Sequence, residues 1–371
     1  MTDQVLAHEG TETAQAFVGR IPVRNIWLLM LYASRLRNQQ EFNKAGVEDN
    51  PDQIPDLVAE YLARIVEVRL RRSLNYSFST RSADVQRVRG RIDLLRTERR
   101  SLLSQGSIHC HFSELTVDSP RNRYVMAALE RASHLVKDKS LVRRCRDLCD
   151  GLSRMGVSGR MPTPAELNSD RSGFNDRHDQ KMLEAARLML EFAIPAESAG
   201  PRRLERPDRE EKWLRQLFEQ AVAGFYDVML TPGGWKVVTG RKLAWDRTEE
   251  TWRIAELMPE MRTDIVLEHH SSDRRIVIDT KFTEIVKANQ FGREKLKSGY
   301  IYQLYTYLFS QINQGDLLAD AASGMLLHPA IDTHYCETVC IQGHNLRFAT
   351  VNLAGSAMEI KEHLLDAVDG L

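Results

Sequence analysis

Two acidic residues and a lysine, Asp264, Asp279 and Lys281, have the types and spacing best suited to chemistry. Alternating polar and apolar residues predict strands over 261–269 and 275–282, with the two acids each on one face of its strand. A short polar turn joins the strands, so they can pair antiparallel, with facing side chains about 5 Å apart. Two carboxylates and one ammonium would then meet among otherwise apolar residues.

The chemistry open to this group is the binding of a hard cation. A buried carboxylate must pair with a charge or bind a metal. Mg²⁺ prefers oxygen ligands and keeps several waters, which leaves room for a substrate phosphate. We therefore expect a Mg²⁺ site at Asp264 and Asp279, of the kind that a metal-dependent nuclease uses. An ion-paired strand edge, in which Lys281 neutralises Asp279, is the alternative.

The acid-x-lysine triplet gains its meaning from its setting. The sequence contains four such triplets, which begin at Asp179, Glu210, Asp279 and Glu359. Three of them fall in expected helices or loops, and in a helix residues two apart do not face each other. The triplet at Asp279 lies in an expected strand, with an acid on the preceding strand.

Two expected helices flank the strand pair and carry further polar residues. The segment 210–230 has helical periodicity and includes Glu219, which could supply a third carboxylate. The segment 298–312 has Gln303 among tyrosines and leucines, where an uncharged polar residue is conspicuous. A solvent-facing helix position is the alternative interpretation of Gln303.

The C-terminal half has the order helix, strands, helix, strands, which is typical of an α/β fold. Three prolines in 195–208 predict a linker and a domain boundary near residue 200. Residues 1–20 are polar and aperiodic, and we expect a flexible leader there. The N-terminal half mixes helices with strands over 87–93 and 107–115, an α+β pattern. Its first helix is expected to begin at Asn25 as the N-cap.

Arginine dominates part of the N-terminal half. Residues 64–100 contain 11 Arg and 4 acids. In RVRGRIDLL, alternation predicts a strand over 87–93 with an arginine face, and Gly90 indicates a bulge or a close backbone approach. The whole chain has 51 basic and 51 acidic residues, so its net charge is zero. The distribution of charge, rather than its sum, bears on a nucleic-acid partner.

Composition excludes several classes of protein. A length of 371 residues corresponds to about two domains. The longest apolar run has eight residues, far fewer than the roughly 20 that span a bilayer. No secretory signal is recognisable. The five cysteines lack the C-x2-C spacing of a zinc knuckle, so we expect no structural zinc and reduced thiols in a cytoplasmic protein.

Several sequence blocks, in order and in register, carry a family resemblance. The blocks are IPVRNIWLLMLYA, GRIDL, LMPEMRTDIVL, IVIDTKF, YQLYTYL and LLHPAIDT. From about residue 20 onward the chain resembles the McrC family, the nuclease subunits of McrBC modification-dependent restriction systems. The order helix glutamate, Asp, Asp-x-Lys, helix glutamine also resembles the PD-(D/E)xK nuclease superfamily. Thr263 stands where the superfamily name has proline, and the second acid is Asp.

The resemblance implies a fold and an activity. It implies an α+β domain over 21–200 that binds an AAA+ ring, followed by an α/β PD-(D/E)xK, restriction-endonuclease-like domain over 201–371. It implies Mg²⁺-dependent cleavage of DNA that contains modified cytosine, together with a McrB-like GTPase. The sequence has no G-x4-G-K-[ST] motif, so GTP would be bound by the partner and not by this chain.

The resemblance also implies roles for single residues. Asp264, Asp279, the Thr280 carbonyl and Glu219 would hold Mg²⁺. Lys281 would orient the attacking water and stabilise developing negative charge. Gln303 would position that water or hold Lys281.

Contacts with the partner are expected at arginines in the N-terminal half, namely Arg24, Arg87, Arg89 and Arg91. For Arg24, a salt bridge at the helix start is the alternative. Three other functions stay open from sequence. They are a non-catalytic regulator of an AAA+ partner, a stand-alone repair nuclease, and an arginine-rich DNA-binding protein.

Overall fold

The computed structural model divides into two compact units. Unit 1 combines Met1–Ile54 with Ile194–Leu371, and unit 2 is Pro55–Ala193. The residues that the structure describes are 17–18, 20–39, 42, 48–72, 74, 76–169, 177–198, 207–245, 247, 249–283, 285–288, 294–331 and 334–371. Most of the expected leader and linker lies outside them. No helix among the described residues combines the length and apolar character needed to cross a bilayer.

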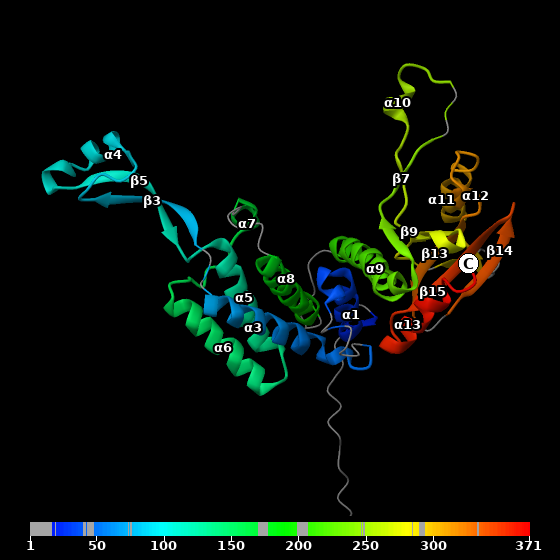
Figure 1. Ribbon diagram of the computed structural model, residues 1–371, viewed down its shortest axis with the longest axis horizontal. Coiled ribbons are helices and arrows are strands. Elements are labelled where there is room, and N and C mark those ends of the chain that lie inside the picture. The colour runs from blue at the N-terminus through cyan, green and yellow to red at the C-terminus, as the bar shows by residue number, and fades with distance from the viewer. Residues whose placement is uncertain are drawn as a thin grey trace, which may run out of the picture. The chain divides into compact units, whose positions relative to one another are not determined.

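A six-stranded mixed sheet forms the centre of unit 1 (Figure 1). Strands β10, β13 and β15 run parallel, while β9, β6 and β14 pair antiparallel with their neighbours. The fold is therefore mixed α/β. In spatial order the strands are β14 (Cys336–Ile341), β15 (His344–Asn352), β13 (Ser323–Ala330), β10 (Arg274–Thr280), β9 (Ile265–His269) and β6 (Lys236–Thr239).

The predicted antiparallel strand pair is confirmed as β9 and β10. Ile265 lies opposite Ile278, and Val266 lies opposite Val277. The same register places Asp264, which directly precedes β9, opposite Asp279. The strand expected over 261–269 is interrupted at that point, because Met261–Arg262 belongs to the separate strand β8.

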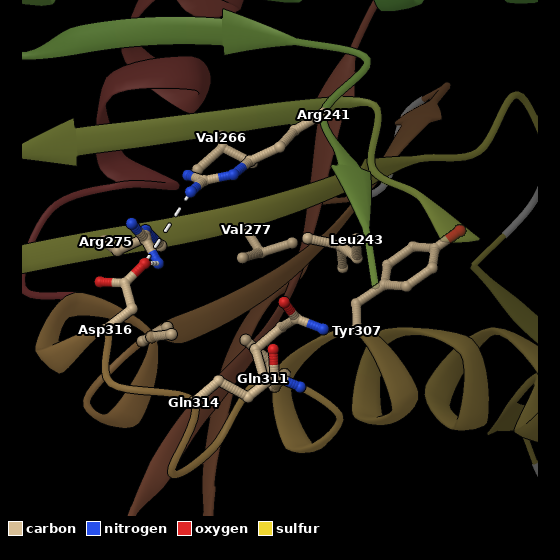
Figure 2. Close-up of a pocket in the computed structure, with 12 residues that line it drawn as sticks. Arg241, Leu243, Val266, Arg275, Val277, Tyr307, Gln311, Gln314 and Asp316 are labelled. Atoms are coloured by element: carbon tan, nitrogen blue, oxygen red, sulfur yellow. Dashed lines mark hydrogen bonds and ion pairs between the residues drawn. The ribbon is translucent and has the colours of Figure 1, made fainter. Parts of the chain in front are cut away.

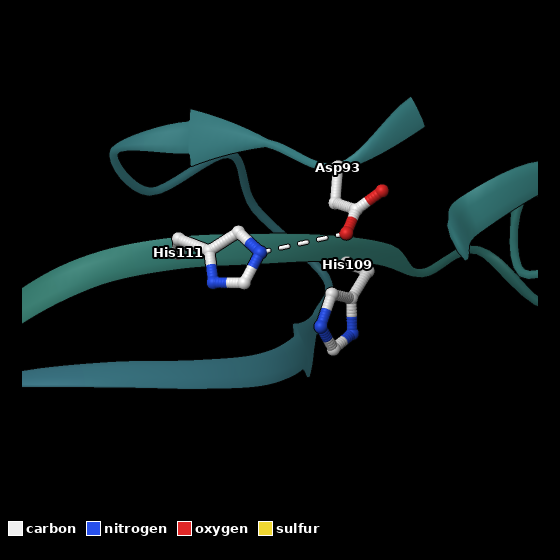
Figure 3. Close-up of side chains that lie close together, drawn as sticks. All are labelled: Asp93, His109 and His111. Atoms are coloured by element: carbon white, nitrogen blue, oxygen red, sulfur yellow. Dashed lines mark hydrogen bonds and ion pairs between the residues drawn. The ribbon is translucent and has the colours of Figure 1, made fainter. Parts of the chain in front are cut away.

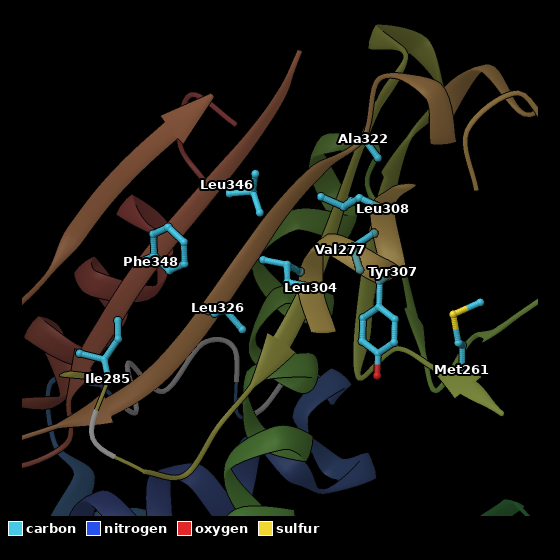
Figure 4. Close-up of a cluster of buried hydrophobic side chains, with 10 residues drawn as sticks. All are labelled: Met261, Val277, Ile285, Leu304, Tyr307, Leu308, Ala322, Leu326, Leu346 and Phe348. Atoms are coloured by element: carbon cyan, nitrogen blue, oxygen red, sulfur yellow. The ribbon is translucent and has the colours of Figure 1, made fainter. Parts of the chain in front are cut away.

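Helix α11 (Ser298–Phe309) covers the sheet face that carries Val277 (Figure 4). Its leucines Leu304 and Leu308 join the buried cluster that also contains Leu326. A side chain at Gly324 would place its Cβ 2.8 Å from Cδ1 of Leu308. A larger residue here would therefore displace the Leu308 side chain. The close approach of α11 to the sheet brings the polar residues of α11 near the strand ends.

Three more helices complete the core of unit 1: α1 (Val23–Ala33), α9 (Pro207–Leu230) and α13 (Ala357–Asp366). The Tyr226 hydroxyl on α9 donates to the Leu364 carbonyl on α13 at 2.8 Å. Asn25 is fully buried and donates to the carbonyls of Leu353 and Gly355 at 2.8 and 2.9 Å. The expectation that Asn25 is an N-cap was wrong, since the helix already begins at Val23.

Unit 1 also contains short strands and helices outside the central sheet. Strands β7 and β8 form a two-stranded extension that carries α10 at its far end (Figure 1). The bounds of the remaining elements are β1 (Phe17–Val18), β2 (Ile21–Pro22), β7 (Lys242–Leu243), β8 (Met261–Arg262), α10 (Ile254–Leu257), β11 (Val286–Ala288), β12 (Glu294–Leu296) and α12 (Leu317–Asp320).

Unit 2 contains helices and a three-stranded antiparallel sheet with the order β3-β5-β4. Ser119 is the N-cap of α5, and its hydroxyl oxygen accepts a hydrogen bond from the Asn122 backbone amide at 3.1 Å. The elements are α3 (Ile54–Arg72), β3 (Ser77–Val85), β4 (Arg91–Ile92), α4 (Leu94–Arg99), β5 (Ile108–Thr116), α5 (Pro120–Leu135), α6 (Lys139–Arg154), α7 (Pro164–Ser169) and α8 (Arg177–Ser198).

The strand expected over 87–93 is largely wrong. Only Arg91 and Ile92 belong to β4, while Arg87 and Arg89 precede it in an irregular segment. Gly90 adopts φ +64°, and a Cβ there would lie 2.3 Å from the His111 carbonyl oxygen. The expected close approach at Gly90 is therefore present, and its left-handed backbone ends the regular strand.

The compact units and the expected domains divide the chain differently. We expected residues 21–54 to belong to the N-terminal domain, 21–200. In the structure, their contacts within the fold place them with the C-terminal half, in unit 1. The hydrogen bonds of Asn25 to the segment after β15 give one physical reason. The change from unit 2 to unit 1 at residue 194 lies close to the boundary expected near 200.

Candidate active site

The Asp279 carboxylate is the most deeply buried charge at the ends of β9 and β10. Asp279 is 1% exposed, and the Lys281 ammonium lies 2.7 Å from its Oδ2. Beyond this ion pair, neither carboxylate oxygen has a hydrogen-bond partner among the described residues. Burial raises the pKa of Asp279 to about 6, although Lys281 opposes the rise, and nearby Asp264 adds to it. The positive charge of Lys281 therefore does not offset the cost of burying the ionised Asp279 carboxylate.

Asp264 braces the end of strand β10. Its Oδ2 accepts hydrogen bonds from the Thr280 amide at 2.7 Å and from the Thr280 hydroxyl at 2.9 Å. These bonds fix the backbone between Asp279 and Lys281. The structure thus brings together the two acids and the lysine that the sequence singled out.

Glu219 approaches the same group from helix α9. The side chain is half-buried, and its pKa is raised by burial and then by the negative charges of Asp264 and Asp279. Arg262 and Lys281 oppose this rise. The three carboxylates are not all within 4.8 Å of one another, since the one such group among the described residues lies in unit 2. The carboxylates of Glu219, Asp264 and Asp279 are thus more widely spaced than that group in unit 2.

Gln303 reaches the site through a tyrosine that sequence reasoning missed. The Gln303 amide donates to the Tyr307 hydroxyl at 2.6 Å. Gln303 is half-buried, so the solvent-facing interpretation does not hold. Burial raises the pKa of the Tyr307 hydroxyl; Gln303 opposes this, while Asp279 and Asp264 contribute to it. The spacing of four residues on one helix face was the available signal for Tyr307.

Aromatic residues surround Lys281 on the other side. Its ammonium lies 5.4 Å from the centre of the Tyr300 ring, and the Lys297 ammonium lies 5.6 Å from the same centre. His328 is 1% exposed, and its Nδ1 lies 2.8 Å from the carbonyl oxygen of Thr283. Burial, helped by Lys297 and Lys281, lowers the pKa of His328 to about 4. His328 is thus a neutral imidazole that donates to Thr283 near neutral pH.

A cavity of about 140 Å³ lies on the same sheet face, farther from the strand ends (Figure 2). Tyr307 lines one side of it. On the other side, Arg275 lies 2.6 Å from Glu268 and 2.7 Å from Asp316. Arg241 also pairs with Glu268. The full lining is Arg241, Leu243, Val266, Arg275, Val277, Tyr307, Leu308, Gln311, Gln314, Asp316, Ala319 and Ala322.

The cavity and the carboxylate site are therefore chemically different. The charged side chains beside the cavity already neutralise one another, two arginines against two acids. Asp279, by contrast, has one ammonium, that of Lys281, within ion-pair distance among the described residues. The need for added positive charge lies at the strand ends.

The arginines expected to contact a partner are found in both units. Arg24 on α1 has no ion-pair partner in the described part of the chain, and its Nε is buried without a hydrogen bond. The helix-start salt bridge is therefore not formed. In unit 2, Arg87, Arg89 and Arg91 are exposed, and the Arg89 guanidinium lies 5.3 Å from the centre of the Phe112 ring.

Comparisons with known proteins agree on one system. A family model described as "McrBC 5-methylcytosine restriction system component" matches residues 5–204. The chain is 28% identical over 352 residues to "Type IV methyl-directed restriction enzyme EcoKMcrBC" of Escherichia coli K12, covering 94% of this chain and 97% of that protein.

Two solved assemblies from Thermococcus gammatolerans are also similar. One is a half-complex of McrB AAA+ hexamers with bound McrC, with a TM-score of 0.42, 12% identity, and coverage of 94% of this chain and 76% of that chain. The other is the McrBC complex, with a TM-score of 0.32, 15% identity, and coverage of 46% and 50%.

Proposed function

The chain belongs to the family of McrBC 5-methylcytosine restriction system components, and from this premise we propose that it is the Mg²⁺-dependent endonuclease subunit. The proposed substrate is DNA that contains modified cytosine. The catalytic domain of the protein is proposed to have a fold of the PD-(D/E)xK class. One observation carries the proposal. A buried aspartate, Asp279, lies opposite Asp264 and pairs with Lys281. Beyond that ion pair, its carboxylate oxygens have no hydrogen-bond partner among the described residues.

The side chains at the strand ends fit a hard divalent cation. Asp264, Asp279 and Glu219 offer carboxylate oxygens, the ligand type that Mg²⁺ prefers. Burial raises the pKa of Glu219 and of Asp279, and the negative charge of Asp264 adds to both rises. When bound, Mg²⁺ polarises a phosphoryl oxygen and lowers the pKa of a coordinated water. The Thr280 carbonyl remains a proposed fourth ligand.

The chain's own residues would position the attacking water, stabilise the developing charge and hold the site in place. Lys281 can hold a water for in-line attack and stabilise negative charge that develops on the phosphate, because its ammonium is fixed between Asp279 and the Tyr300 ring. Asp264 keeps the backbone at Thr280 in place through two hydrogen bonds. Gln303, oriented by Tyr307, supplies a further polar group at the edge of the site.

The proposed partner is a McrB-like AAA+ GTPase ring. Family membership supports this pairing, and so does the name of the Escherichia coli relative, which describes a McrBC enzyme. The sequence has no phosphate-binding G-x4-G-K-[ST] motif, so we assign GTP binding and hydrolysis to the partner. Arg24, Arg87, Arg89 and Arg91 remain the proposed contacts with that ring.

The test compares two lysines that lie at similar distances from the Tyr300 ring, 5.4 Å for Lys281 and 5.6 Å for Lys297. Lys281→Ala should reduce cleavage of cytosine-methylated plasmid by about 100-fold or more, since it removes transition-state stabilisation. Lys297→Ala should cleave within a few-fold of the unchanged protein. Both are assayed with the McrB-type GTPase of the same organism, GTP and Mg²⁺, and GTP hydrolysis is followed in parallel.

The outcomes separate the competing functions. Loss of cleavage with normal stimulation of GTP hydrolysis supports the proposal. Full cleavage by Lys281→Ala would contradict the assigned site. Stimulation by the unchanged protein without any cleavage would identify a non-catalytic regulator, and cleavage without partner and GTP would identify a stand-alone nuclease. Salt-sensitive DNA binding by this chain alone, without either activity, would identify a simple DNA-binding protein.

A further inference from the structure

Unit 2 holds a second group of metal-ligating side chains, far along the sequence from the nuclease residues. His109 and His111 are two residues apart on β5, so they share one face of the sheet. Asp93 follows β4, the neighbour of β5. One ligand atom from each residue lies within 4.8 Å of the others. Figure 3 shows the His111 ring directed at the Asp93 carboxylate, with the His109 ring beside them.

The separation of two of these ligands suits a shared ion better than a hydrogen bond. The His111 Nε2 lies 3.4 Å from Oδ2 of Asp93, which is longer than the ordinary range for an N–H···O bond. Two ligands bound about 2.1 Å from one tetrahedral ion lie about 3.4 Å apart. The other oxygen of Asp93, Oδ1, accepts the Arg96 amide at 3.0 Å and so holds the carboxylate in this orientation.

His109 already has the supporting bond that metal-binding histidines make. Its Nδ1 lies 2.5 Å from Oδ1 of Asp84, so the carboxylate holds the proton on that nitrogen. The lone pair is then on Nε2, which the Ser82 hydroxyl meets at 2.7 Å. Carboxylate–histidine–metal chains of this kind fix the tautomer and strengthen the ligand. An ion bound at Nε2 would replace this hydrogen bond to Ser82.

Access and ligand type complete the argument. The His109 side chain is 4% exposed, whereas those of His111 and Asp93 are 30% exposed, so an ion can enter and a water can complete its coordination. Two imidazoles and one carboxylate suit a transition ion such as Zn²⁺, while Mg²⁺ favours oxygen ligands alone. Cys110 points to the opposite face, between the two histidines in sequence.

We propose that Asp93, His109 and His111 bind one divalent transition-metal ion of the Zn²⁺ class, with Asp84 as the positioning residue behind His109. The ion joins the segment between β4 and α4 to the central strand β5. It therefore ties the start of α4, whose N-cap is Asp93, to that strand. The site is independent of the carboxylate site in unit 1 and does not rest on the proposed nuclease function.

The experiment uses the full chain after dialysis against a chelator. Titration calorimetry with Zn²⁺ should reveal a site that His111→Gln weakens by about 100-fold or more. Asp93→Asn should also weaken it, while keeping the helix cap, since asparagine caps as well as aspartate does. Asp84→Asn should weaken it by about 10- to 100-fold, as second-layer substitutions do. The exposed His134→Gln is the matched control and should bind as the unchanged protein does.

A spectroscopic measurement identifies the ligands. The Co²⁺-loaded protein should have d–d bands of a nitrogen and oxygen site without thiolate charge transfer, and His111→Gln should lose them. Thermal melting of the metal-free variants checks that they fold. Two results would overturn the proposal: unchanged Zn²⁺ affinity in folded His111→Gln, or a thiolate signature that substitution of Cys110 removes.

Discussion

The Lys281 ammonium lies 2.7 Å from Oδ2 of Asp279, where the aspartate side chain is 1% exposed and the lysine side chain is 19% exposed. The pair is thus asymmetric, because water reaches the cation much more than the anion. One partly hydrated ammonium does not offset the loss of solvation of the carboxylate, and the pKa of Asp279 rises to about 6. The folded chain keeps this unfavourable charge where the proposed function needs a ligand.

The first prediction is that Asp279→Asn stabilises the metal-free protein. An acid with a pKa raised from 3.8 to about 6 binds its proton more tightly when folded, so stability falls as pH rises from about 4 to 6. The substitution should raise the free energy of unfolding by up to roughly 3 kcal/mol at pH 8. The gain should shrink as the pH is lowered through 6 toward 4. Urea denaturation at several pH values measures this.

Asp273→Asn is the control for that experiment. Asp273 is exposed in the turn between the same two strands, at φ +50°, a conformation that asparagine tolerates. Its substitution should change stability little at any pH. If Asp279→Asn were destabilising at pH 8, the buried carboxylate would have a partner that its surroundings do not suggest.

The second prediction concerns Mg²⁺, and it rests on the proposed nuclease site. Mg²⁺ should raise the melting temperature of the unchanged protein at pH 8, because a ligand that binds the folded state stabilises it. The rise should be smaller at pH 5.5, where Asp279 is largely protonated. Asp279→Asn should abolish most of the shift. An equal shift in that variant would place the Mg²⁺ effect elsewhere.

The third prediction is an acid transition due to His328. Folding lowers the pKa of this histidine from 6.5 to about 4. Its contribution to stability is therefore fully present above pH 6.5 and is lost as the pH falls toward 4, by up to roughly 3 kcal/mol. His328→Asn keeps a donor for the Thr283 carbonyl but cannot titrate, so its stability should vary less over this range. An identical pH profile in the two proteins would contradict the assignment.

The fourth prediction concerns the buried ion pairs beside the cavity. Glu268→Gln should destabilise unit 1 by about 3–5 kcal/mol, since it leaves the 8% exposed Arg275 without its main counter-charge. Glu260→Gln is the matched control. It breaks a pair of 2.8 Å with Lys242 in which both side chains are about two-thirds exposed, and its effect on the free energy of unfolding should be much smaller than that of Glu268→Gln.

A double variant gives a second test of the same ion pair. Replacing Glu268 and Arg275 together by leucine removes both buried charges. Its cost should be smaller than the sum of the two single substitutions, a difference that chemical denaturation detects. Strict additivity would mean that the two charges do not depend on each other.

Sequence reasoning succeeded where side-chain alternation and register are local. The positions of Asp264 and Asp279 follow from two alternating segments and one short turn, and β9 and β10 form accordingly. It failed where distant segments decide. Asn25 has the residue type of a helix cap, but its side-chain amide donates hydrogen bonds to carbonyls more than 300 residues away in sequence. The arginine alternation over 87–93 looked like a strand, but Gly90 turns the backbone out of it.

The group in unit 2 was missed for a related reason. His109 and His111 stand together in sequence, but Asp93 joins them only through the pairing of β4 with β5. Cysteine spacing carries no information about a proposed site made of imidazoles and a carboxylate. Gln303 was identified as unusual, whereas Tyr307, its hydrogen-bond partner, looked like one more aromatic core residue.

The hydrogen bonds of Asn25 have a consequence for how the protein is made. Helix α1 is synthesised early, but the carbonyls that its buried amide requires belong to Leu353 and Gly355. Unit 2 is encoded between them, so it is translated in full before those carbonyls exist. The proposed nuclease unit therefore matures only after the segment beyond β15 has been translated. A chain that ends before Leu353 would contain β9 and β10, with Asp264 and Asp279, but would lack the carbonyls that Asn25 requires.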